Sequence, residues 1–477
     1  MKEDSIRKNP KKGNIEREYS SKEQYLKALL EQVRCKKAHT YIREEIECHM
    51  EEQIEDNLLS GMTQEEAERT AVEDMGSPIE TGIALDHIHR PKMAWSMVLF
   101  MAVVALLGIA IHQGIVGKLL VNTEFATNQT AIINGSSNFV WYTLIGFGLM
   151  LLIYRMDYIT IGKHAKVLAV TFLAALLFTM LFGQYVNGRV MWLVGFGSVN
   201  VSIYSFVMLY VPLYGAVLYK YFGTGYKGLG MAILWGIAPV CVILGMRYTF
   251  LAGMMAVILT MVLSMAIWLN WFRVSRKKVL VALWGVVAGI PVLGITLVYK
   301  MGWLAPYQMH RIQAFLTNSG DANYVTGMLR SFLANSNILG DSGLEVVGWL
   351  SDFNSSWILM YLASAYGIAI MVLAVGAVVT LIIKIFAAVL VQKNQLGMIM
   401  GFGCGSVFLV QTVLNLLENV GFFPATRTFL PFLSAGGSDL IISYMLMGIV
   451  LSVYRYKSIY PKHVSVKGKE VNIRISF

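Results

Sequence analysis

The sequence predicts an all-α polytopic membrane protein with about ten transmembrane helices and a small N-terminal helical domain. Of the 477 residues, 56% are hydrophobic and 14% are charged, a balance that soluble globular proteins of this size do not have. Apolar runs long enough to cross about 30 Å of hydrocarbon recur along most of the chain. These runs are continuous rather than alternating, which argues against a β-barrel.

The first 90 residues are charged and carry helical rather than membrane patterns. Residues 1–21 are polar, and we expect a disordered tail. Residues 22–90 are expected to form a cytoplasmic domain of two or three helices. Gly61 should end one of them, and Thr63 with Glu66 should form a capping box for the next. Apolar residues recur every four positions along one helix face, at Ile42, Ile46, Met50, Ile54 and Leu58.

The expected membrane domain covers residues 91–456, followed by a basic cytoplasmic tail over 457–477. We expect spans near residues 94–112, 138–155, 166–183, 199–218, 230–246, 250–270, 279–299, 356–383, 397–420 and 437–455. Loops rich in Lys and Arg alternate with poorer ones, at 155–166, 219–227, 271–278 and 384–393. By the positive-inside rule both termini lie in the cytoplasm, and the long loop 301–355 lies outside.

The same placement of charge argues against a nucleic-acid partner, although the net charge is +10. Lys and Arg lie between spans and in the tail rather than on one basic face. A zinc site is also disfavoured. Cys35, His39, Cys48 and His49 lie on helices, and no second ligand pair follows at metal-binding spacing.

Three outer segments carry the residues that could perform chemistry. Asp352 is the acid closest to a span, so protein and lipid can shield it while it still reaches water. Asn187-Gly188 predicts a tight turn from which Arg189 projects. Gly436, Gly437 and Ser438 expose backbone amides where the last span begins, and such amides favour an anion.

These segments resemble motifs of the SEDS family (shape, elongation, division and sporulation proteins, including RodA, FtsW and SpoVE). The most specific is similar to the family's Pro-Phe-x-Ser-x-Gly-Gly-Ser signature and stands here as Pro431–Ser438. Three weaker elements resemble Asn-Gly-x-x-x-Trp-Leu, Tyr-Gln-x-x-Arg-Ile and Asp-Phe, and they are Asn187–Leu193, Tyr307–Ile312 and Asp352–Phe353. They occur in the family's order within residues 94–455. Val33–Pro78 also resembles a permease prefix domain.

The resemblance implies a peptidoglycan glycosyltransferase that polymerises lipid II at the bacterial cytoplasmic membrane, beside a class B penicillin-binding transpeptidase. Asp352 would then be the catalytic base. Arg311, Arg189 and the amides of Gly436 and Gly437 would stabilise the pyrophosphate leaving group. Ser434 and Ser438 complete the expected substrate-binding set. A divalent cation, Mg²⁺ or Mn²⁺, could assist, although no acid cluster predicts a metal site.

The chain also departs from the family, because several of its usual acids are replaced. Non-acidic residues stand at these places, in Gly348-Trp349, Ser364–Gly367, Gly245–Thr249 and Val201–Ile203. The missing acids leave two alternatives open: a flippase for a lipid-linked precursor, and a non-catalytic scaffold for a transpeptidase.

Each candidate residue also has a purely structural interpretation. Asp352 could cap the eighth span. Arg189 and Arg311 could be cations that reach from the chain to the membrane interface. Gly436, Gly437 and Ser438 could serve only as a packing hinge.

Overall fold

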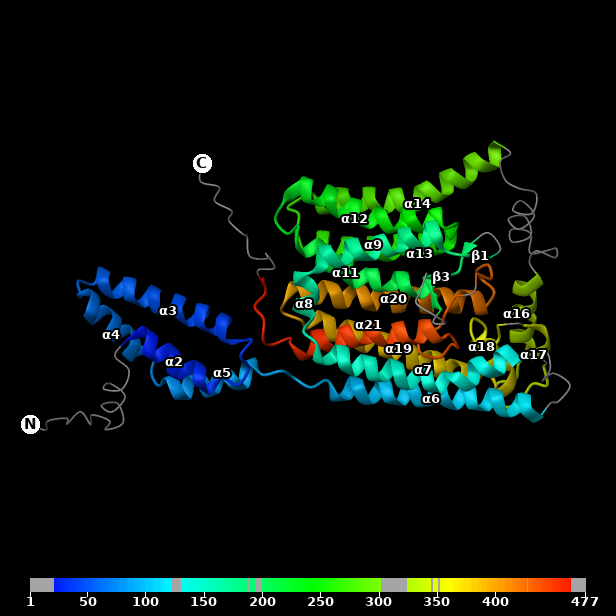
Figure 1. The fold of residues 1–477 in the computed structure, drawn as a ribbon, viewed down its shortest axis with the longest axis horizontal. Coiled ribbons are helices and arrows are strands. Elements are labelled where there is room, and N and C mark those ends of the chain that lie inside the picture. The colour runs from blue at the N-terminus through cyan, green and yellow to red at the C-terminus, as the bar shows by residue number, and fades with distance from the viewer. Residues whose placement is uncertain are drawn as a thin grey trace, which may run out of the picture. The chain divides into compact units, whose positions relative to one another are not determined.

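The computed structural model describes residues 21–121, 130–186, 189–193, 200–301, 324–344, 346–350, 352–426 and 428–464. These residues form two compact units (Figure 1). The N-terminal unit contains residues 21–93 together with Arg455–Val464, and the membrane unit contains Ala94–Tyr454.

The N-terminal unit has four helices, where the sequence predicted two or three. They are α2 (Lys22–Gln32), α3 (His39–Leu59), α4 (Gln64–Asp74) and α5 (Pro78–His89). The extra helix arises because Gly76 ends α4 with a φ of +73°, and Pro78 then occupies the first turn of α5, where its missing N–H costs nothing. The capping box of α4 is confirmed, since Thr63 and Glu66 bond each other's backbone amides.

The core of this unit confirms most of the predicted apolar face. Ile42, Ile46 and Met50 are buried, whereas Leu58 is 38% exposed at the end of the helix. The segment Arg455–Val464 belongs to the same core: the Tyr460 ring packs edge-on against that of Tyr41 at 5.7 Å. The chain therefore completes this small unit with a segment from its far end.

The membrane unit confirms the predicted all-α membrane class. In the described residues, nine helices are long and apolar enough to cross a membrane. They are α6 (Trp95–Val121), α7 (Thr130–Arg155), α9 (Ala165–Phe182), α12 (Gly225–Gly245), α13 (Thr249–Trp268), α14 (Arg276–Lys300), α19 (Ile368–Leu390), α20 (Gln395–Asn419) and α21 (Gly437–Arg455).

Two expected spans differ in the structure. The segment expected at 199–218 is a shorter apolar helix over Ile203–Tyr219, made of α10 (Ile203–Phe206), a 3₁₀ turn η1 (Val207–Leu209) and α11 (Tyr210–Tyr219). The segment expected at 356–383 divides at Gly367 (φ +102°) into α18 (Ile358–Tyr366) and α19. Because α19 continues to Leu390, most of the loop expected at 384–393 is helix.

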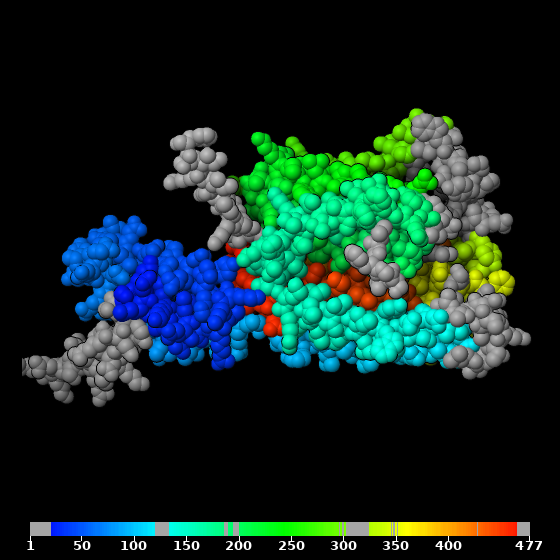
Figure 2. All heavy atoms as spheres, viewed as in Figure 1, coloured from blue at the N-terminus to red at the C-terminus, as the bar shows by residue number. Residues whose placement is uncertain are grey.

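Helix α20 lies at the centre of the membrane unit, packed against α11, α13 and α19. Of its most apolar stretch 72% of the residues are buried, compared with 67% for α21 and none for α14. Figure 2 shows the same arrangement, with the orange and red side chains of α20 and α21 visible between the cyan layer of α6 and α7 and the green layer above. The central helices therefore have room for polar residues that an outer helix facing lipid would not tolerate.

The loops at one end of the membrane unit contain further short elements, and we call this end the cavity end (right in Figure 1). They are β1 (Tyr185–Val186), β2 (Arg189–Val190), β3 (Trp192–Leu193), β4 (Val201–Ser202), α16 (Tyr324–Asn335) and α17 (Val346–Trp349). The opposite end carries the remaining helix, α8 (Tyr158–Lys163).

Candidate active site

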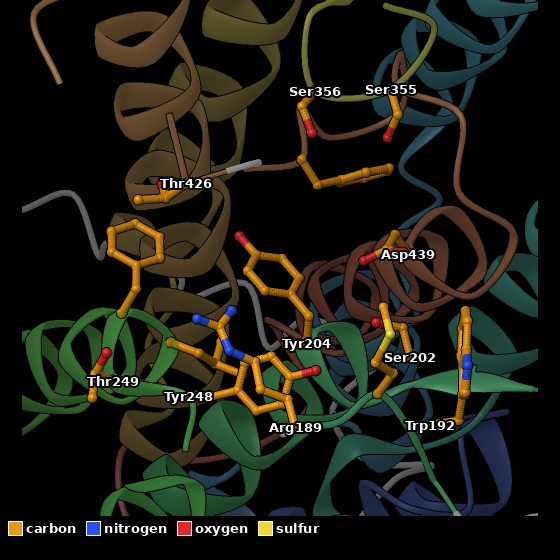
Figure 3. A pocket seen from close by; sticks show the side chains of 14 residues that line it. Arg189, Trp192, Ser202, Tyr204, Tyr248, Thr249, Ser355, Ser356, Thr426 and Asp439 are labelled. Carbon is orange, nitrogen blue, oxygen red and sulfur yellow. The ribbon is translucent and has the colours of Figure 1, made fainter. Parts of the chain in front are cut away.

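A cavity of about 530 Å³ opens at the cavity end of the membrane unit. It combines aromatic walls with hydroxyl groups, one cation and one acid (Figure 3). The residues that line it are Arg189, Met191, Trp192, Ser202, Tyr204, Tyr248, Thr249, Phe250, Leu251, Ser355, Ser356, Thr426, Phe429 and Asp439. A concave site with apolar walls and a few convergent polar groups is the usual form of a small-ligand site.

Two short antiparallel ladders build one wall. Val186 pairs with Arg189 in the first, and Trp192 pairs with Ser202 in the second. The amide of Ser202 donates a hydrogen bond to Oγ of Ser438, 3.1 Å away, and so joins β4 to the start of α21. Arg189 and Trp192, distant from α21 in sequence, are thereby held on the same cavity.

Arg189 faces an aromatic ring across the cavity. Its guanidinium carbon lies 5.6 Å from the centroid of the Tyr248 ring, within cation–π range. Tyr248 follows Arg247, which has a φ of +63°, an uncommon conformation for a residue with a side chain. Burial raises the pKa of the Tyr248 hydroxyl, and the Arg189 charge offsets part of that rise, so Tyr248 stays a neutral hydrogen-bond donor.

The segment before α18 forms the opposite wall. Its carbonyl groups are bonded by side chains from other elements: Nδ2 of Asn415 and Nδ2 of Asn419 each lie 3.0 Å from the Ser356 carbonyl oxygen. Oγ of Ser434 donates to the Ser355 carbonyl at 2.8 Å. With their backbone fixed in this way, Ser355 and Ser356 direct their hydroxyl groups into the cavity (Figure 3).

Asp352 lies just outside the cavity, at the start of this wall. Its carbonyl oxygen accepts bonds from the amides of Ser355 and Trp357, at 3.0 and 3.1 Å, which closes a tight turn. Trp357 occupies the N-cap position of α18, so capping that helix is not the role of Asp352. The Asp352 side chain is half-buried, and among the described residues it does not line the cavity, although its neighbours Ser355 and Ser356 do.

The start of α21 at Gly437 packs closely against α7. A side chain at Gly437 would meet the Tyr142 ring at 2.8 Å, so the close approach of α21 to α7 requires glycine there. Ser434 is fully buried: its hydroxyl donates to Ser355 and accepts from the Leu430 amide at 3.0 Å. These contacts explain why Gly437 has no side chain and where the Ser434 hydroxyl bonds; they do not involve the Gly437 amide.

Sequence analysis missed Asp439, the one acidic side chain among the described residues that line the cavity. It is the third residue of α21, and the Ser205 hydroxyl donates a hydrogen bond to its Oδ1. The sequence did indicate this residue, because Asp439 is an ionisable residue inside an apolar span, and such a residue is a functional candidate by default.

Glu418 is a second acid at this end, and it holds the loop that follows α20. Its carboxylate accepts a hydrogen bond from the Thr426 hydroxyl and another from the Thr428 amide, 3.2 Å away. Its side chain is fully buried and does not line the cavity.

Arg311 lies outside the described residues. Gly436 lies beside Asp439, since a side chain at Gly436 would come within 3.0 Å of Asp439 Oδ2. In the part of the chain that the structure describes, no three His, Cys, Asp or Glu residues come together as metal ligands.

Residues 94–459 match the sequence profile of the FtsW, RodA and SpoVE family of cell cycle proteins. A probable peptidoglycan glycosyltransferase FtsW of Geobacter sulfurreducens is 26% identical over 331 residues, which are 65% of this chain and 83% of the relative. The corresponding FtsW of Pseudomonas fluorescens is 23% identical over 414 residues, covering 81% of this chain and 92% of the relative.

The fold is also similar to solved structures. A chain in a peptidoglycan synthase complex that coordinates polymerisation and crosslinking superposes with a TM-score of 0.60 at 20% identity, covering 76% of this chain and 98% of the other. The rod shape determining protein RodA of Thermus thermophilus gives a TM-score of 0.51 at 17% identity, with coverage of 76% and 97%. The match extends over nearly all of each neighbour.

Proposed function

Because this chain belongs to the FtsW, RodA and SpoVE family of cell cycle proteins, we propose that it is a membrane glycosyltransferase that polymerises lipid II into peptidoglycan strands. The relatives named as probable peptidoglycan glycosyltransferases support this assignment. The observation that carries it within the structure is the cavity of about 530 Å³. Its aromatic rings and hydroxyl groups suit a saccharide, which has apolar ring faces and polar edges.

In the reaction we propose, two lipid-linked saccharides meet at the cavity. The 4-hydroxyl oxygen of the acceptor attacks the anomeric carbon of the donor, and the bond from that carbon to the pyrophosphate breaks. Asp352 takes the proton of the attacking hydroxyl. Asp352 would act from its place just outside the cavity lining, in the same turn as Ser355 and Ser356, which line the cavity.

The leaving pyrophosphate carries negative charge that must be stabilised. We propose Arg189, Arg311 and the amides of Gly436 and Gly437 for this role, with Ser438 beside them. Arg189 lines the cavity and is exposed, so an anion can reach its guanidinium. The first amides of α21 are also free of intrahelical partners and favour an anion.

We place the protein in the bacterial cytoplasmic membrane with both termini in the cytoplasm. The cavity end then faces outward. Basic side chains at the opposite end, such as Arg276, Lys277 and Lys278 at the start of α14, support this orientation. In this position the enzyme would work beside a class B penicillin-binding transpeptidase.

A polymerisation assay with the purified full chain and lipid II tests the function. We expect the parent to make glycan polymer and Asp352→Asn to lower the rate by a factor on the order of 10²–10⁴, with little change in melting temperature. Movement of lipid II across a vesicle membrane without polymer would instead favour the flippase. A parent that neither polymerises nor moves lipid II, yet binds the transpeptidase, would be a scaffold.

A further inference from the structure

We propose that Asp439 is the carboxylate with which the cavity binds the hydroxyl groups of its saccharide substrate. This inference rests on the function proposed above and assigns a binding role to a residue outside the motif that identified the site.

The bonding of Asp439 leaves part of its carboxylate available. In the described part of the chain, Ser205 is the one side chain that donates a hydrogen bond to it, and that bond reaches Oδ1. The other oxygen, Oδ2, lies beside Gly436, where any side chain would come within 3.0 Å of it. Glycine at this position therefore keeps Oδ2 uncovered, while Ser205 fixes the orientation of the group.

The surroundings of Asp439 suit a sugar. Figure 3 shows its carboxylate and the hydroxyl groups of Ser355 and Ser356 directed toward the same space. Trp192, which is 42% exposed, also lines the cavity and offers an aromatic face to the apolar side of a sugar ring. A carboxyl group has two oxygens that can accept hydrogen bonds, so neighbouring sugar hydroxyls are well-matched donors.

A structural role must be weighed against this one, because an acid in the first turn of a helix is favoured by the helix dipole. Glu418 provides the comparison at the same end of the molecule. It is fully buried, and both of its oxygens accept hydrogen bonds from the loop that it holds. Asp439 instead is only partly buried and lines the cavity, which is the position of a binding group.

The test is steady-state polymerisation by the full chain with lipid II as the substrate. Asp439→Asn keeps the size of the side chain but loses the charge. We expect its KM to rise about 10- to 100-fold while kcat changes by less than about threefold, because a charge-assisted bond to bound substrate is lost. The matched control is Glu418→Gln, which should lower the melting temperature and leave KM unchanged.

An active Asp439→Asn protein with the KM of the parent would overturn the inference. So would a collapse of kcat at unchanged KM, since that result would make Asp439 a proton acceptor instead of a binding group. If Asp439→Asn does not fold, Ser205→Ala takes its place: the carboxylate remains but loses its orienting hydroxyl. A several-fold rise in KM then supports the inference, and an unchanged KM overturns it.

Failure of the proposed function gives a different result. If the parent makes no polymer, lipid II affinity is measured directly by titration of the parent and of Asp439→Asn. Weaker binding by the variant keeps Asp439 as a saccharide ligand of a non-polymerising protein. Equal affinity overturns the inference.

Discussion

The N-terminal unit and the cavity end of the membrane unit differ in how they satisfy their backbone polar groups. In the N-terminal unit the N-cap side chains are local, since Thr63 bonds the amide of Glu66 and Ser77 bonds the amide of Glu80; the more distant acceptors there, Glu68 for the Lys22 amide and Asp86 for the Arg34 amide, lie 46 and 52 residues away. At the cavity end the partners of buried backbone carbonyl groups are distant in sequence. Nδ2 of Asn419 donates to the Ser356 carbonyl oxygen over a separation of 63 residues, and Nε2 of His112 lies 2.9 Å from the Leu433 carbonyl oxygen over 321.

The difference follows from the solvent around each region. Water can form hydrogen bonds with the backbone groups at an exposed helix end, so a local cap adds only modestly to stability. Irregular backbone at membrane depth is tolerated only where protein or a cavity satisfies it. The broken segments at the cavity end therefore require buried amide side chains as donors.

The largest effect on stability should come from removing one of those donors. Nδ2 of Asn415 donates to two carbonyl groups, those of Ser356 and Thr428, at 3.0 and 2.9 Å. Asn415→Ala should destabilise the folded protein by about 2–4 kcal/mol, because both buried carbonyls lose this donor. Thermal unfolding in detergent measures the change.

Asn335→Ala is the matched control, since the exposed Asn335 bonds a carbonyl on its own helix and should matter little. Equal effects of the two substitutions would show that the contrast between buried and local bonding is wrong.

A smaller effect is expected at the break between α18 and α19. Gly367 has a φ of +102°, and a Cβ there would approach the Ile338 carbonyl oxygen to 2.6 Å. Gly367→Ala should therefore destabilise the protein by about 1–3 kcal/mol. Gly376→Ala, within α19 and with nothing within 4 Å of its Cβ, should leave stability unchanged or raise it by up to about 1 kcal/mol. Similar melting temperatures for the two variants would argue against a fixed break.

The smallest effect is expected in the N-terminal unit. Thr63→Ala removes the cap of α4 and should cost about 1 kcal/mol. Hydrogen bonds from Thr63 lower the pKa of the Glu66 carboxyl. The contribution of the Glu66 carboxylate to stability is therefore fully present above the pKa of the carboxyl in the unfolded chain. It is lost as the pH falls through the lowered pKa of the folded protein. Circular dichroism melts at neutral and acidic pH should show the parent and Thr63→Ala converging in acid; a constant difference would contradict the capping-box contribution.

The sequence by itself determined the class, most of the membrane spans and the capping box of α4. Run length is enough to identify a span, and residue type at fixed spacing is enough to identify the capping box of Thr63 and Glu66. Motif order was also enough to indicate the family. These features depend on neighbours within a few residues or on linear order, and both are visible in a sequence.

Only the tertiary structure decided which polar groups share a cavity. Asp352 and Asp439 both stand beside family motifs, yet Asp439 lines the cavity and Asp352 lies next to its wall. The break at Gly367 was likewise absent from the hydropathy pattern, because the segment remains apolar on both sides of it. The direction in which a side chain points depends on how each helix is rotated against its neighbours, and that rotation is set by contacts between residues hundreds of positions apart.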